Sequence, residues 1–206
     1  MRPTTTVESI LGTRSRVAVL RLLRGINVPL NASQIASRTG LTRPAVTSVL
    51  HDFAAMGIVR SSSAGRANVH SLEHDNIYVE RMIAPLFNTE EHLPDDLTEE
   101  LRTSFENLTA SIVLFGSYAR GDQDESSDVD VVLVARDRES QLTIERTIDA
   151  YSVRFRRRFG ATLSPLVYST AEAADLLRTA PNLAESLRSD AFVISGTSPW
   201  EWLGDG

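Results

Sequence analysis

Two apolar runs with a polar loop between them constrain this chain more than any other feature. The first run, residues 111–115, ends at Gly116-Ser117, and the second runs from Asp128 to Val134 with a further aspartate, Asp130, at its start. Side chains alternate faces along a strand, so Asp128 and Asp130 are expected to point the same way. Two neighbouring carboxylates repel each other, and a divalent cation between them offsets that repulsion. The pattern therefore predicts two strands with a metal site where the loop meets the second one.

The loop itself has the chemistry of a phosphate site. Gly116 has no Cβ, which lets a phosphate approach the backbone, and Ser117 offers both an amide and a hydroxyl. Arg120 can neutralise phosphate charge. Because Mg²⁺ (or Mn²⁺) takes oxygen ligands and usually shares them with a polyphosphate, we expect a nucleoside triphosphate here. The alternative is a glycine-rich hairpin with a hydrophilic loop and no ligand.

The order of these residues resembles the polymerase-β-type nucleotidyltransferase superfamily, and within it the minimal nucleotidyltransferases. The matching positions are Gly116-Ser117, Ala119-Arg120-Gly121 and Ser127-Asp128-Val129-Asp130. The resemblance implies a mixed α/β (α+β) domain in which Asp128 and Asp130 bind the metal and, in an active enzyme, act as catalytic residues. It also implies a third carboxylate on a later strand.

That third carboxylate is missing from the expected place. The matching strand is residues 161–168, where Ser164 occupies the position of the acid, and no acidic residue lies between Gly160 and Glu172. A serine hydroxyl is a poor metal ligand and cannot act as a base near neutral pH. Glu145 or Asp149 could substitute, although their spacing does not favour it. Nucleotide and metal binding are therefore better supported than catalysis.

The charge of the chain is unevenly distributed along its 206 residues. Residues 1–72 hold nine arginines and two acids, whereas the remainder holds twelve arginines and twenty-five acids, which together give the net charge of −6. The basic front part indicates an anionic partner for that part alone. There is no cysteine, and every basic residue is arginine, which excludes disulfides, thiolate metal sites and a lysyl-nucleotide intermediate.

The basic front part has the pattern of a winged helix-turn-helix. Helices are expected over residues 14–24 and 32–38, the second with Asn31 and Gln34 as a capping box. A third helix begins after Thr42, with Val46, Val49, Leu50 and Phe53 as its buried stripe. Residues 58–62 and 68–72 then form the hairpin of the wing.

Residues 33–46 and Met56-Gly57-Ile58-Val59 are similar to winged-helix regulators of the MarR and ArsR type. By that resemblance the third helix reads base edges and the wing contacts the DNA backbone. The residues expected to contact double-stranded DNA are Thr42, Arg43, Pro44, Thr47, Ser48, His51, Arg60 and Arg66. The alternative is a winged helix that makes only protein contacts.

Together these patterns predict a winged helix-turn-helix over residues 1–74, a helical linker over 75–96 and a nucleotidyltransferase-like domain over 97–206. The acidic stretch 88–96, which contains Pro94, is expected to separate a helix over residues 75–87 from one over 97–109. The favoured function is a DNA-binding transcriptional regulator that binds a Mg²⁺-nucleotide, with little turnover. The alternatives are an active nucleotidyltransferase acting on a protein, RNA or small molecule, and a scaffold in a larger complex such as a toxin–antitoxin pair. A homodimer is expected, because helix-turn-helix proteins usually read two half-sites. No segment has the length of a membrane span or the core of a signal peptide, so we expect a cytoplasmic protein.

Overall fold

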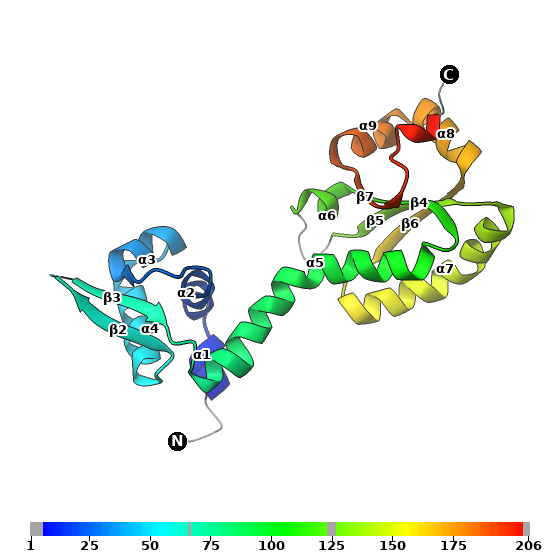
Figure 1. Cartoon of the computed structure of the whole chain (residues 1–206). Coiled ribbons are helices and arrows are strands. Elements are labelled where there is room, and N and C mark those ends of the chain that lie inside the picture. Colours follow the sequence, from blue (N-terminus) through cyan, green and yellow to red (C-terminus); the bar gives the residue numbers. More distant parts are fainter. Residues whose placement is uncertain (1–5, 66, 123–126, 204–206) are drawn as a thin grey trace. The chain divides into compact units, whose positions relative to one another are not determined.

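The structure is a computed structural model that describes residues 6–65, 67–122 and 127–203. The chain divides into two compact units, Met1–His92 and Leu93–Gly206 (Figure 1). The mixed helix and sheet content predicted from the sequence is confirmed. No helix among the described residues combines the length and the apolarity that a membrane crossing requires.

The first unit is a helix-turn-helix followed by a β-hairpin. Its three strands form an antiparallel sheet in the order β1-β3-β2. The predicted capping box is confirmed, because the Asn31 side chain accepts a hydrogen bond from the Gln34 backbone N–H and the Gln34 side chain accepts one from the Asn31 backbone N–H. The elements are α1 (Thr6–Leu11), α2 (Arg14–Arg24), β1 (Leu30–Asn31), α3 (Ala32–Thr39), α4 (Arg43–Ala55), β2 (Val59–Ala64) and β3 (Ala67–Leu72).

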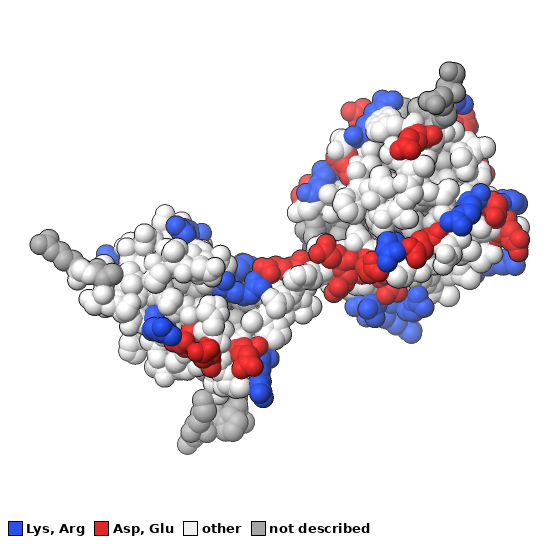
Figure 2. All heavy atoms as spheres, viewed as in Figure 1, with Lys and Arg blue, Asp and Glu red and all other residues white. Residues whose placement is uncertain are grey.

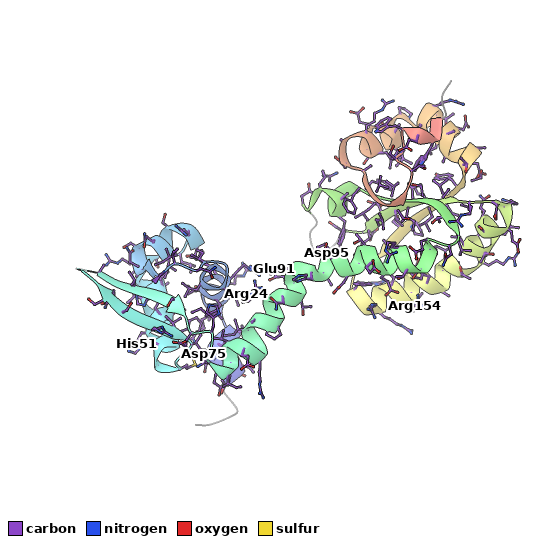
Figure 3. All side chains as sticks on the ribbon, viewed as in Figure 1. Arg24, His51, Asp75, Glu91, Asp95 and Arg154 are labelled. Atoms are coloured by element: carbon purple, nitrogen blue, oxygen red, sulfur yellow. The ribbon has the colours of Figure 1, made fainter. Side chains whose placement is uncertain are left out.

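The core of this unit extends beyond the wing. The predicted stripe of α4 is buried, with Val46 and Phe53 fully enclosed. A π-helix, Val79–Ile83, and the start of α5 (Ala84–Phe105) add Val79, Ile83 and Phe87 to the same core. Arg24 of α2 pairs with Glu91 of α5 at 2.5 Å (Figure 3). Arg21 likewise pairs with Glu90 at 2.7 Å. The first turns of α5 are thus part of the winged-helix unit.

The second unit is a four-stranded mixed sheet in the order β6-β5-β4-β7. Strands β5 and β6 are parallel, and the other pairs are antiparallel. One face of the sheet is covered by α5 and α7, and the other by α8 and α9 (Figure 1). Trp202 packs in the core on the α8 and α9 side. Its further elements are β4 (Thr109–Phe115), α6 (Gly116–Arg120), β5 (Val129–Ala135), α7 (Arg138–Phe159), β6 (Leu163–Ser169), α8 (Thr170–Thr179), α9 (Pro181–Asp190) and β7 (Phe192–Gly196).

Two local expectations were wrong. The acidic stretch around Pro94 was predicted to separate two helices, but α5 continues through it. A proline removes one helical hydrogen bond, yet Leu97, Leu101 and Phe105 are buried after it, and that packing holds the helix together. The loop after β4 was expected to be irregular, and its first five residues instead form the short helix α6.

Candidate nucleotide and DNA sites

The two aspartates meet at the start of β5, as their spacing predicted. Asp128 is exposed and Asp130 is half-buried. Burial raises the pKa of Asp130, and repulsion from Asp128 raises it further, whereas a hydrogen bond from Ser164 opposes the shift. The two carboxylates are therefore close enough to destabilise each other when both are ionised. Such a pair favours a bound cation.

Gly116 shapes the same site from the end of β4. Phe115 lies opposite Asp130 in the β4–β5 register, so Gly116 passes directly beside that aspartate. An added Cβ at Gly116 would lie 2.6 Å from Asp130 Oδ2, and the φ angle of Gly116 is +74°. Both the space and the left-handed backbone require glycine there. The structure thus brings Gly116 to Asp130, and Ser117 is the next residue, in the first turn of α6.

Ser164 occupies the position from which the sequence resemblance requires an acid. In the parallel β5–β6 pair, Asp130 and Ser164 are register partners. Among the described residues there is no group of three His, Cys, Asp or Glu side chains that could hold a metal ion. Glu145 and Asp149 lie on exposed positions of α7. The described protein ligands for a cation are therefore Asp128 and Asp130, and phosphate and water oxygens would have to complete the shell of a hard cation.

Arg120 lies near the site but is paired with protein carboxylates. Its guanidinium contacts Asp190 at 2.6 Å and Asp122 at 3.1 Å, and these bonds raise the pKa of Arg120. Asp190 ends α9, seventy residues further along the chain, so local spacing could not reveal it. A phosphate that contacts Arg120 has to compete with Asp190 for it.

The predicted DNA-reading residues of α4 share one exposed surface. Thr42, Arg43, Pro44, Thr47, Ser48 and His51 are all exposed, opposite the buried stripe. The His51 side chain is 84% exposed, and the Thr47 hydroxyl donates to the Arg43 carbonyl at 2.9 Å. Thr42 is the N-cap residue of α4 but makes no side-chain capping bond. The predicted residues of α4 thus form one exposed polar surface.

Of the two arginines predicted for the wing, the structure describes Arg60. Arg60 is held by Glu73 through two hydrogen bonds of 2.7 Å, which raise the pKa of Arg60. A phosphate contact from Arg60 would first have to break that pair. Arg66, at the predicted tip, lies outside the described residues.

A hollow of about 580 Å³ lies between α4 and the hairpin. Arg43, Thr47 and His51 line it from α4. Its lining also includes Asn31, Ser61, Asn68 and His70, which were not predicted from the sequence to belong to the DNA-reading surface. Ser61 and His70 Nδ1 are 2.9 Å apart, and burial lowers the pKa of His70. Ser61 of β2 and Asn68 and His70 of β3 lie on the face of the hairpin that points toward α4. The alternation of side chains along a strand could have predicted this shared face.

Family models match both parts of the chain. A model described as IclR helix-turn-helix domain matches residues 17–63, and one described as nucleotidyltransferase domain matches residues 95–164. The predicted combination of a winged helix-turn-helix with a nucleotidyltransferase domain is therefore confirmed, with the IclR type as the matching class.

Two proteins of Methanocaldococcus jannaschii, each described as "Putative protein adenylyltransferase", are similar to part of this chain. One is 32% identical over 73 residues, which are 35% of this chain and 73% of that protein. The other is 34% identical over 79 residues, 35% of this chain and 50% of that protein.

Two solved structures also align with parts of the chain. One, described as a predicted DNA-binding transcriptional regulator from E. coli, is 22% identical with a TM-score of 0.36, over 42% of this chain and 86% of that one. The other, described as a toxin-antitoxin with AMP-PNP, is 19% identical with a TM-score of 0.33, over 53% and 78%. From the sequence relatives and the two family models, the chain belongs to the nucleotidyltransferase-domain family and carries an IclR-type helix-turn-helix domain ahead of that domain.

Proposed function

We propose that this protein is a DNA-binding transcriptional regulator whose second unit binds a Mg²⁺-nucleotide with little or no turnover. The observation that carries the proposal is the register of β5 and β6, in which Ser164 stands beside Asp130. The superfamily that the sequence resembles uses an acid there. The nucleotide then acts as a signal rather than as a substrate.

Metal and nucleotide binding are assigned to the loop end of the sheet. Asp128 and Asp130 hold Mg²⁺ or Mn²⁺, and the nucleotide phosphates lie against Gly116 and Ser117. The cation shields the aspartate pair and links it to the phosphates. Support comes from the raised pKa of Asp130, whose charge is disfavoured without a cation, and from the close approach of the loop at Gly116.

Calorimetry with Mg²⁺ and ATP, and with the other nucleoside triphosphates, tests this assignment. Asp128→Asn with Asp130→Asn should abolish Mg²⁺-dependent binding, while Asp175→Asn, an exposed change on α8, should leave it intact. Unchanged affinity in the double variant would show that the loop is a plain hairpin turn.

Turnover is tested by the release of pyrophosphate from each triphosphate, with and without cell extract as a source of acceptors. The wild type should release little, because Ser164 occupies the strand position at which the superfamily that the sequence resembles has its acid. Ser164→Asp should raise any activity, although Pro165 follows it directly and restricts the strand.

DNA binding is assigned to the exposed face of α4. Arg43→Ala should weaken binding and relax sequence discrimination by about 1–3 kcal/mol at the base it reads. The control is Arg81→Ala, an exposed arginine of the same unit outside the helix-turn-helix. If the full-length protein binds no duplex DNA at low salt, the regulator proposal fails. We further propose that two copies bind DNA as a homodimer, because one winged helix supplies few base contacts. The compartment that we propose is the cytoplasm.

A second candidate is an active nucleotidyltransferase that transfers a nucleotide to a protein. The observation that favours it is the similarity to two proteins described as adenylyltransferases. The test is incubation of the wild type with α-³²P-ATP and candidate proteins. Labelling of a protein that is lost in Asp128→Asn would establish this candidate and exclude the proposal of a regulator that does not turn over its nucleotide.

A further inference from the structure

The last part of α7 carries a concentration of arginines in an otherwise acidic unit. Arg154, Arg156, Arg157 and Arg158 fall within five residues, and no acidic residue lies between Asp149 and Glu172. Figure 2 shows their basic atoms gathered over the end of α7, and Figure 3 labels Arg154 there. Residues 73–206 as a whole hold twenty-five acids and twelve arginines, so this cluster opposes the charge around it.

Most of this positive charge is available to a partner. Arg154 and Arg158 both reach Glu100, at 3.5 and 3.3 Å, and their side chains remain 65% and 63% exposed. Arg156 and Arg157 are exposed and have no ion pair within the part of the chain that the structure describes. Glu100 therefore pairs with two of the four guanidinium groups, and the other two have no carboxylate partner among the described residues. The negative end of the helix stabilises cations in its last turn, but it leaves their outward N–H donors unbound.

The chemistry of the cluster selects the kind of anion. Arginine presents a planar fork of donors that matches the oxygens of a phosphate. Of the aromatic rings among the arginines, Tyr151 and Phe155 are only 8% and 1% exposed. Phe159 is half-buried, packs against Phe155 and has the Arg158 guanidinium 5.5 Å from its ring centre. Single-stranded nucleic acids bind mainly by stacking bases on exposed aromatic rings, and these rings are not accessible for that. A surface of arginines without a stacking platform fits the phosphate backbone of a duplex.

We propose that the arginine cluster of α7 binds the phosphate backbone of a double-stranded nucleic acid, and that this surface acts separately from the DNA-reading face of α4. The nucleotidyltransferase unit then has its own nucleic-acid contact. The proposal does not depend on nucleotide binding at the aspartate pair.

The test uses the full chain with Arg43→Glu, so that the α4 contact is weakened in every sample. Fluorescence anisotropy at several salt concentrations would follow binding to a DNA duplex and to an RNA duplex of the same sequence. In this background, Arg156→Ala with Arg157→Ala should lower affinity at least fivefold. It should also reduce the slope of log affinity against log salt by roughly 2, since each phosphate contact contributes about 0.9.

The control is Arg146→Ala with Arg178→Ala, which removes the same charge from exposed positions of the same unit outside the cluster. Its affinity should stay within twofold of the background, and circular dichroism should show that all variants remain folded. Binding by one duplex only would identify the partner as DNA or RNA, and binding by both would indicate recognition of the shared backbone. Equal losses in the two double variants, or no binding of either duplex, would overturn the proposal.

Discussion

At the scale of single residues, the absence of one methyl group decides how closely the loop after β4 approaches Asp130. Gly116→Ala should cost on the order of 1–2 kcal/mol for the left-handed backbone. It should also displace Asp130 and thereby abolish Mg²⁺-nucleotide binding. The matched control is Gly121→Ala, whose φ is +73° but whose Cβ would meet nothing within 4 Å. Urea unfolding should show a similar backbone cost in both variants, and calorimetry should show lost binding only in Gly116→Ala. Equal binding in the two would contradict the role given to Gly116.

Asp130 also predicts a dependence of stability on pH. Its pKa in the folded state is raised by burial and by Asp128, so the folded state favours its protonated form. Ionisation of Asp130, as the pH rises above about 4, therefore lowers stability. In the absence of metal, Asp130→Asn should raise the free energy of unfolding at pH 7 and have little effect at pH 3. Urea unfolding at both pH values would measure this, with Asp175→Asn as the control. A decrease at pH 7 would show that the charge is instead stabilised by its surroundings.

At the scale of helices and strands, capping distinguishes two starts that look alike in sequence. Asn31 caps α3 with a full capping box, whereas Thr42 begins α4 without a side-chain bond. Asn31→Ala should cost about 0.5–2 kcal/mol of stability, and Thr42→Ala should cost much less. Thermal and urea unfolding of the two variants would compare them. A larger loss in Thr42→Ala would mean that its hydroxyl has a structural role the geometry does not show.

The elements also show what the sequence could predict. Helix α2 and strands β4 and β5 were predicted within about two residues, because the periodicity of apolar residues is a local signal. The Asp128–Asp130 pair and its alignment with Ser164 followed from strand alternation and from the family resemblance. The pairing of Arg120 with Asp190 could not be predicted, because it joins residues seventy positions apart. The continuation of α5 through Pro94 depends on packing against the core, and the rule that a proline ends a helix does not take such packing into account.

At the scale of the whole molecule, each unit has buried apolar side chains of its own. The core of the first unit includes residues that lie beyond residue 74, where the predicted winged helix-turn-helix ends. Val79, Ile83 and Phe87 are at most 3% exposed and belong to it. A fragment of residues 1–92 should therefore fold alone, while residues 1–74 should not. Losing three buried apolar side chains removes about 1.5–3 kcal/mol each, a total comparable to the stability of a small domain. Circular dichroism and urea unfolding of both fragments would decide this. Cooperative unfolding of the shorter one would mean that its core is sufficient.

Strand β6 forms one edge of the sheet and contains Pro165, while β7 forms the other edge. The unpaired N–H and C=O groups of an edge strand can bind a strand of another chain, which leads to aggregation. A proline in an edge strand opposes this pairing, because it has no N–H to donate. Strand β7 has no proline and exposes Phe192 and Val193, at 52% and 36%. Strand-by-strand growth is therefore possible on one side only. If two chains paired through their β7 strands, the free edge of each sheet would be β6, which contains Pro165. Association of this kind would therefore stop at a dimer and would not extend into filaments.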